Sequence, residues 1–140
     1  MPQFIRVSSM VYFISGHRDL TKEEFEQHYI PWISRVMDED SMADFVVGDW
    51  EGCDTMALEF ILSQPSYEFI SIYCVDKPNI RIFGEHPEVF ERVFIYKCKS
   101  YDECDSVMTL ASDFDIAWVR PGKEDSHTAK NIKRRYGFNN

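Results

Sequence analysis

The chain has 140 residues, of which 44% are hydrophobic and 15% aromatic, and its formal net charge is −9 at pH 7. This composition excludes a disordered chain and predicts a single domain over residues 1–140, long enough to bury a core. No apolar stretch approaches the roughly 20 residues that span a bilayer, and the N-terminus lacks the apolar core of a signal peptide. The acidic charge disfavours a nucleic-acid polymer as partner, since such binding depends on neutralising phosphates. We therefore expect cytoplasmic localisation and no membrane partner.

The cysteine spacing indicates thiols rather than cross-links. The chain holds four cysteines with separations of 21, 24 and 6 residues and no CxxC pair, namely Cys53, Cys74, Cys98 and Cys104. Neither a zinc site nor a disulfide framework is typical of that spacing, so we expect reduced thiols, no metal and no cofactor.

The first third of the chain predicts a strand followed by a broken helix. Residues 8–15 form a nearly continuous apolar run, which is typical of a strand covered on both faces. Thr21 and Glu24 form a capping box, so a helix should begin at Lys22. Pro31 removes a backbone donor and should kink this helix or split it into two.

A second strand is predicted over residues 45–47, and it leads into the glycine-containing turn 48–54. Asp54 should cap the helix that follows, and Pro65 should end it. A third strand is expected over residues 69–75.

Residues 76–92 are expected to be mostly loop, because proline and glycine interrupt them. Residues 92–97 predict a fourth strand, with a helix over residues 88–96 as the alternative. Residues 101–111 predict a helix whose inner face carries Val107, Met108 and Ala111.

The last strand is predicted over residues 115–119, within an apolar run that Pro121 and Gly122 stop. Ser126 or Thr128 should cap a final helix, whose N-terminus would present free N–H groups to an anion. Residues 120–140 hold six Lys/Arg against two acids, a local charge of +4. A cationic end on an acidic protein favours a small anionic ligand over a polymer.

Strands that alternate with helices predict an α/β fold, a Rossmann-like three-layer sandwich. We expect about five mostly parallel strands with helices on both faces. Right-handed crossovers place every strand-to-helix loop at one edge of such a sheet, where ligands bind. This rule predicts one cleft made by residues 15–19, 48–54 and 120–128.

The turn after the second strand offers two kinds of group. Gly48 and Gly52 permit close backbone approach, and the following helix start favours an anion. Asp49 would repel a bare phosphate and suits a ribose hydroxyl or a base. The alternative is a tight structural turn with Asp54 as its cap.

The turn after the first strand comprises Ser15, Gly16, His17 and Arg18. Arg18 is suited to a phosphate or carboxylate, and His17 to proton transfer near neutral pH. A solvated loop would look the same. Three aromatic residues could stack on a base or belong to the core, namely Tyr12, Trp50 and Tyr73.

Three segments carry a resemblance to one family: FVVGDxxGxDxMA from Phe45, DxxMTxxSD from Asp105, and DIAWVRxG with SxTAKNIxxR from Asp115. Together they resemble the Rossmann-like SLOG superfamily. Its relatives include the LOG proteins, which are cytokinin-releasing phosphoribohydrolases, and nucleoside 2-deoxyribosyltransferase-like proteins. The resemblance implies a nucleotide-related ligand near the glycine-containing loops and self-association as a dimer or higher homo-oligomer.

The chain departs from the resembling proteins at two positions. His127 precedes Thr128 where relatives have a Gly-Thr pair, and Asn131 stands where the enzymes carry a glutamate that acts as nucleophile or acid/base. An amide can orient a sugar hydroxyl but cannot take up a proton under ordinary conditions. Hydrolysis would therefore need Asp49, Asp54 or His127 as a substitute.

These patterns give three hypotheses. The first is a protein that binds a small nucleotide-related anionic ligand at the carboxyl edge of the sheet, as a sensor or sequestering protein. The second is an N-glycosidic-bond enzyme with His17 or His127 as proton carrier and Asp49 or Asp54 as stabiliser. The third is a scaffold that has lost the ligand. The predicted ligand-binding set is Ser15, Gly16, Arg18, Gly48, Gly52, Arg120, Gly122, Ser126, Thr128 and Asn131.

Overall fold

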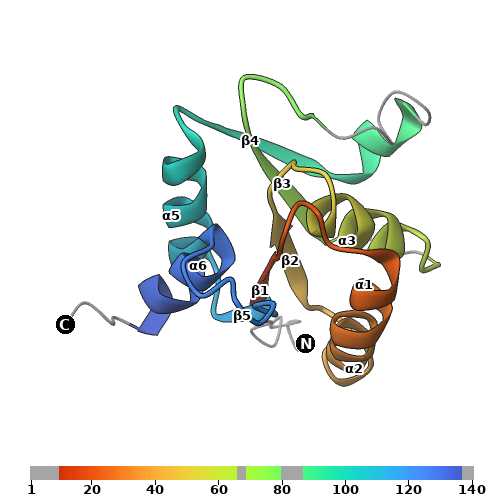
Figure 1. The fold of residues 1–140 in the computed structure, drawn as a ribbon. Helices are drawn as coiled ribbons and strands as arrows, with labels where there is room; N and C mark the ends of the chain where they lie inside the picture. Colours follow the sequence, from red (N-terminus) through yellow and green to blue (C-terminus); the bar gives the residue numbers. More distant parts are fainter. Residues whose placement is uncertain (1–9, 66–68, 80–86, 137–140) are drawn as a thin grey trace, which may run out of the picture.

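The protein is an α/β domain built on one parallel sheet (Figure 1). The computed structural model describes residues 10–65, 69–79 and 87–136. Within these ranges five strands form a sheet in the order β4-β3-β2-β1-β5, and every neighbouring pair is parallel. The strands are β1 (Val11–Ser15), β2 (Asp44–Val47), β3 (Ile70–Val75), β4 (Phe94–Cys98) and β5 (Phe114–Ala117). This confirms the predicted fold class.

Helices cover both faces of the sheet (Figure 1). One face carries α1 (Lys22–His28), α2 (Ile30–Glu39) and α3 (Cys53–Leu62), and the other carries α5 (Tyr101–Ala111) and α6 (His127–Tyr136). A 3-10 helix, η1 (Pro87–Arg92), precedes β4. In the part of the chain that the structure describes, no helix is long and apolar enough to cross a membrane.

The first helical pair forms as its sequence predicts. The side chain of Thr21 accepts the N–H of Glu24 at 3.1 Å, and Glu24 Oε1 accepts the N–H of Thr21 at 3.0 Å, which completes the capping box. Pro31 lies in the first turn of α2, where its missing donor costs no helical bond. The predicted helix is therefore split, with Tyr29 between α1 and α2.

Two local predictions are wrong. The N-cap of α3 is Gly52 and not Asp54, which lies inside the first turn of the helix. On α5, Met108 is buried as predicted, but Val107 and Ala111 are exposed. The predicted fourth strand does form, as β4, and the alternative helix over residues 88–96 does not, since η1 ends at Arg92. Residues 8–9 of the predicted first strand and residues 80–86 of the predicted loop lie outside the described residues.

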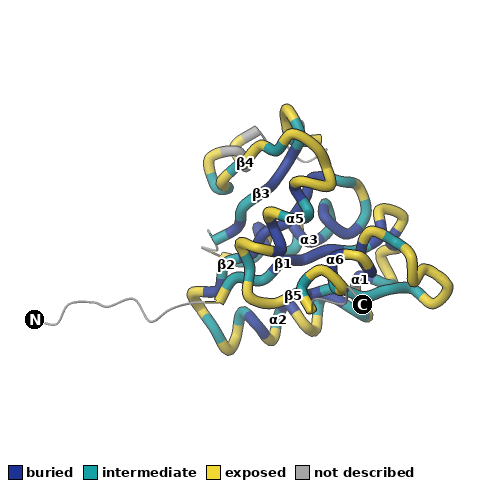
Figure 2. The backbone as a smooth tube through the Cα atoms, turned by 90° about the vertical axis from the view of Figure 1, so that its left-hand side faces the viewer, coloured by how far each residue is buried: buried dark blue, intermediate teal, exposed yellow. Residues whose placement is uncertain are grey.

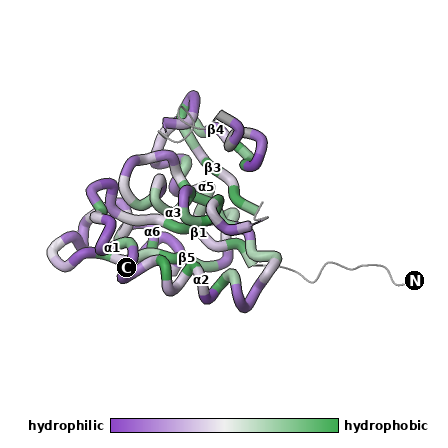
Figure 3. The backbone as a smooth tube through the Cα atoms, turned by 90° about the vertical axis from the view of Figure 1, so that its right-hand side faces the viewer, coloured by the Kyte–Doolittle hydropathy of each residue, from purple (hydrophilic) through white to green (hydrophobic). Residues whose placement is uncertain are grey.

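Two hydrophobic clusters lie on the two faces of the sheet. Alternation along β1 sends Ile14 to the α1–α3 side and Phe13 to the α5–α6 side. The larger cluster includes Tyr29, Ile33 and Leu58, all fully buried. The smaller one is Phe13, Val46, Tyr73, Cys104 and Met108. Figure 2 shows the central strands as buried, and Figure 3 shows hydrophobic segments at the centre and hydrophilic loops at the periphery.

The strand order reverses direction at β1. Strands β1 to β4 follow one another toward one edge, and β5 returns to the other side of β1. The chain after β1 leads to α1 on one face of the sheet, and the chain after β5 leads to α6 on the other, which opens a crevice at the carboxyl ends of the two strands. Ser15 and Ala117, which are register partners, mark this position.

Candidate functional site

A pocket of about 820 Å³ lies at the carboxyl edge of the sheet. It is lined by residues 15–19 after β1, by residues 48–51 with Asp54 after β2, and by residues 125–128 at the start of α6, with Lys123 nearby. The structure thus brings the three predicted loops together. Helix α5 closes the pocket with Tyr101, Cys104, Asp105 and Met108.

The inner end of the pocket is formed around Gly48. Gly48 follows β2, and a Cβ atom at this position would lie 2.8 Å from Asp54 Oδ2 and 3.8 Å from Met108 Cε. The Asp54 carboxylate therefore occupies the space that a side chain would take. It accepts the N–H of Trp50 at 3.1 Å. Ser15 also lines the pocket, and its buried Oγ has no hydrogen-bond partner among the described residues.

Three aspartates with raised pKa values line this region. Burial, followed by the charges of Asp105 and Asp49, raises the pKa of Asp54 to about 7. Burial also raises the pKa of Asp49, although the N–H of Asn79 donates to its Oδ2 at 2.9 Å. Burial raises the pKa of Asp105, opposed by nearby His127 and Arg134. Near neutral pH, Asp54 is therefore a mixture of acid and carboxylate and is suited to proton transfer.

These acids do not form a metal centre. Within the described ranges, no three His, Cys, Asp or Glu side chains are placed so that they could hold a metal ion.

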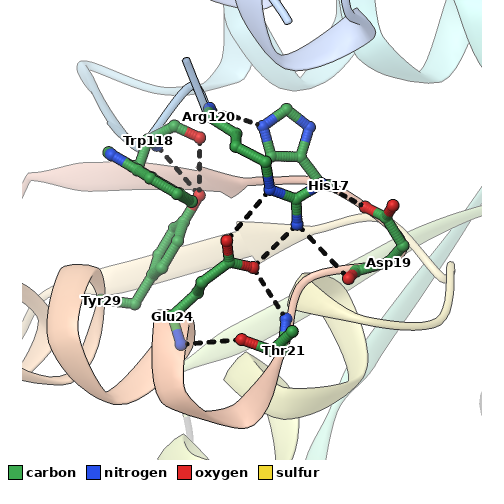
Figure 4. Close-up of polar contacts among 7 residues, drawn as sticks. All are labelled: His17, Asp19, Thr21, Glu24, Tyr29, Trp118 and Arg120. Carbon is green, nitrogen blue, oxygen red and sulfur yellow. Dashed lines mark hydrogen bonds and ion pairs between the residues drawn. The ribbon is translucent and has the colours of Figure 1, made fainter. Parts of the chain in front are cut away.

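His17 lines the pocket, but one of its ring nitrogens has a structural role (Figure 4). The backbone N–H of Arg120 donates to His17 Nε2 at 2.9 Å, so this nitrogen carries no proton. Burial and the nearby Arg120 charge lower the pKa of His17, which keeps the ring neutral. The imidazole thus joins the loop after β1 to the loop after β5, and Nδ1 is the nitrogen left for chemistry.

Arg120 is not a pocket residue, contrary to the prediction. Its guanidinium donates to both carboxylate oxygens of Glu24, at 3.0 and 2.7 Å, and to Asp19 Oδ1 at 3.1 Å (Figure 4). Hydrogen bonds from Arg120 lower the pKa of Glu24 to about 2. The arginine therefore fixes the start of α1 against the end of β5.

The hydroxyl of Tyr29 links the end of β1 to the segment that follows β5. It accepts the N–H of Trp118 at 2.9 Å (Figure 4). The same hydroxyl donates to the carbonyl of Ser15 at 2.8 Å. Gly16 is required here, because a Cβ atom would lie 2.5 Å from Tyr29 Oη and 2.6 Å from Cys53 Sγ. The carboxyl ends of β1 and β5 are thus held in one arrangement.

The basic C-terminal segment does not form an anion site as a whole. Arg134 donates to Asn131 Oδ1 at 2.5 Å, and Arg135 donates to Asp115 Oδ2 at 2.8 Å. Of the six Lys/Arg after position 119, all of them within the described residues, Lys123 is the one that lines the pocket. Six acids line it against Lys123 and Arg18, so the pocket is net negative; these acids are Asp19, Asp49, Glu51, Asp54, Asp105 and Asp125.

The two helix starts near the pocket differ. At α3 the N–H of Cys53 donates to the carbonyl of His17 at 3.2 Å, and Asp54 already places a carboxylate beside the first turn. At α6 the N-cap is Ser126, whose Oγ accepts the N–H of Ala129 at 3.2 Å. Amides at the start of a helix have no intrahelical acceptor. The α6 start, with buried Thr128 and Asn131 in the pocket wall, is the better place for an anionic group.

The pocket has an aromatic wall, formed by Trp50, Tyr73 and Tyr101. The rings of Trp50 and Tyr101 lie 4.7 Å apart, and Arg18 Cζ lies 4.9 Å from the centre of the Trp50 ring. Tyr73 also lines the pocket, whereas the Tyr12 ring packs against those of Phe45 and Phe114 instead. Two of the three predicted stacking residues therefore reach the pocket.

The remaining predicted residues have distinct positions. Gly52 has a φ of 74°, and a Cβ atom there would collide with the carbonyl of Arg18, so it shapes the turn and does not line the pocket. Gly122, with a φ of 88°, also lies outside the lining. His127 is exposed at the rim, with Nδ1 3.9 Å from Asp105 Oδ2.

One cysteine prediction is also wrong, because Cys98 and Cys104 form a disulfide. It ties the end of β4 to α5, and Cys104 lines the pocket. Cys53 and Cys74 are free and buried, as expected of thiols.

Sequence reasoning did not nominate the residues that α5 contributes. Asp105 and Met108 lie three positions apart and share a helix face with Cys104. A charged residue on a helix face that is otherwise buried is the sequence pattern that could have indicated Asp105 as a pocket residue.

Fold and site together define an α/β domain with a pocket at the point where the strand order reverses. Comparison of the chain with protein-family models, with curated proteins and with solved structures found no match.

Proposed function

We propose that the protein binds a nucleoside-related small molecule in this pocket, as a sensor or sequestering protein. The observation that carries the proposal is the meeting of three loops at the carboxyl edge, where the pocket combines an aromatic wall with buried aspartates and with the Ser15 hydroxyl, which has no hydrogen-bond partner among the described residues. An aromatic wall suits a planar base, and buried acceptors suit a donor-rich part of a ligand.

An anionic group of the ligand belongs at the rim and not at the inner end. Lys123, Arg18 and the start of α6 lie there, whereas Asp54 and Asp49 would repel an anion deeper in the pocket. A nucleotide would therefore point its phosphate toward α6.

A thermal-shift panel of nucleosides and their 5′-monophosphates tests this proposal. A ligand at 100 times its dissociation constant stabilises the native state by about 2.7 kcal/mol, which raises the melting temperature measurably. If no member of the panel raises it, the third hypothesis, a scaffold without this ligand, is favoured instead.

A second candidate function is cleavage of an N-glycosidic bond. Asp54 favours it, because this buried pocket acid has its pKa raised to about 7 and can donate a proton to a leaving base. Released base after incubation with the same panel, lost in Asp54→Asn, would support an enzyme. Binding without released base would support the first function.

The resemblance to the SLOG superfamily, cytoplasmic localisation and self-association stay predictions. Size-exclusion chromatography with light scattering measures the last of these directly.

A further inference from the structure

We propose that the inner end of the pocket is a subsite for a protonated primary amine, held by Ser15, Asp54 and Asp105 around Gly48. This inference deepens the proposed function by stating the chemistry of one part of the ligand. It rests on the same pocket but not on the ligand being a nucleoside.

The three groups come from different elements and line one pocket. Ser15 ends β1 and Gly48 follows β2 directly, with Ile14 and Val47 as register partners one step earlier. Asp54 reaches Gly48 from the first turn of α3. Asp105 stands one helical turn before Met108, whose Cε lies 3.8 Å from the point that a Cβ atom on Gly48 would occupy. All three residues line the pocket.

The buried hydroxyl of Ser15 lacks a hydrogen-bond partner that a ligand could supply. Ser15 is only 6% exposed, and its Oγ has no hydrogen-bond partner within the described residues. A buried hydroxyl left unpaired is costly, and most such groups in folded proteins have a partner. A ligand atom at the inner end would supply it.

The negative charges around Asp54 favour a cationic ligand group at the inner end of the pocket. Asp54 forms no ion pair with any described residue, and its carboxylate accepts a hydrogen bond from the N–H of Trp50. Asp49 and Asp105 are near enough to disfavour its ionised form. The side chain paired with Asp105 is that of His127, whose Nδ1 lies 3.9 Å from Oδ2 and which is exposed at the rim. A cationic group would relieve this repulsion, whereas an anion or a second acceptor would add to it.

The kind of cation follows from the chemistry of the acceptors. Within the described residues no three His, Cys, Asp or Glu side chains are placed so that they could hold a metal ion. A primary ammonium carries three N–H donors, which matches the three acceptors Ser15 Oγ, Asp54 and Asp105.

Two matched small probes test the subsite: 1,4-diaminobutane and 1,4-butanediol, titrated into ¹⁵N-labelled protein at pH 8 and followed by NMR. We expect the diamine to shift the amides of Ser15, Gly48 and Asp54 in a saturable manner, and the diol to leave them unchanged. Equal shifts with both probes, or diamine shifts confined to the surface, would overturn the inference.

Variants assign the effect to the subsite. Asp54→Asn and Asp105→Asn should each weaken the diamine about tenfold or more, as loss of a charged hydrogen-bond partner implies. Asp102→Asn is the matched control, because Asp102 is exposed on the same helix and does not line the pocket. It should change affinity less than twofold. Ser15→Ala, which removes one atom, should weaken binding several-fold and covers the case in which an aspartate variant does not fold.

Failure of this inference is distinguishable from failure of the proposed function. Diamine binding without any nucleoside response would keep the subsite and remove the nucleoside. A nucleoside response without diamine binding would keep the proposed function and exclude the amine subsite.

Discussion

The two faces of the sheet differ in what their side chains do. On the α1–α3 face, the large cluster packs fully buried side chains such as Ile33 and Leu58, and the Arg120 guanidinium donates to both carboxylate oxygens of Glu24. On the α5–α6 face the cluster is small and borders the pocket, where the buried Ser15 hydroxyl has no hydrogen-bond partner among the described residues. Asp54 reaches the same pocket from the first turn of α3 and is buried without an opposite charge among the described residues. The α1–α3 face therefore contributes most to the free energy of unfolding, and the polar groups buried around the pocket lower the contribution of the α5–α6 face.

The largest expected effect comes from removing the charge of Asp54. Its native pKa, about 7, lies above its ordinary value, so the native state binds the proton more tightly. Wild-type stability should therefore fall as pH rises from about 4 to about 7 and stay low above that. Asp54→Asn should be more stable than wild type by up to about 4 kcal/mol at pH 8, with almost no difference at pH 4. Urea denaturation at both pH values measures this, and a pH-independent difference would mean that Asp54 is not a buried charge.

Core truncations compare the two faces directly. Leu58→Ala on the α1–α3 face should cost about 3 kcal/mol, because it leaves a closed cavity in fully packed surroundings. Met108→Ala on the other face should cost less than half of that, because the lost volume merges with the pocket. Equal losses in the free energy of unfolding would show that the two faces are packed alike.

Gly48→Ala should displace the Asp54 side chain in the pocket and leave the backbone in place. The new methyl group would meet Asp54 Oδ2 at 2.8 Å and push the carboxylate away, at a cost of about 1–2 kcal/mol. Combining it with Asp54→Ala removes that clash, so the double variant should recover most of the melting temperature. No recovery would place the strain elsewhere.

The smallest effect concerns the rim. Lys123→Ala should weaken a nucleoside 5′-monophosphate a few-fold more than its nucleoside, because an exposed charge pair contributes little. Lys130→Ala, on the exposed side of α6, is the matched control and should affect neither. Titration calorimetry of both ligands separates the two cases.

The sequence predicted the layers of the fold because its local signals agree with the tertiary structure. The Thr21–Glu24 capping box and Pro31 act within a few residues, so their consequences could be read directly. Parallel-strand topology then brought the three loops to one edge.

What the sequence could not give depends on contacts between distant residues. Arg120 was predicted as a ligand residue, but Glu24, 96 positions away, pairs with its guanidinium. Asp54 looked like a cap because its spacing fits one, whereas the space beside Gly48 lets its carboxylate turn into the pocket. Side-chain partners of this kind follow from tertiary packing and leave no periodic signal.

The most direct test of the division between the two faces is an NMR titration with the nucleoside and nucleoside-monophosphate panel, read residue by residue. We predict that a binding member shifts the amides of Ser15, Gly48, Asp105 and Thr128 and leaves those of Ile33 and Leu58 unchanged. Shifts centred on α1, α2 and the part of α3 around Leu58, or no shift with any member of the panel, would contradict it.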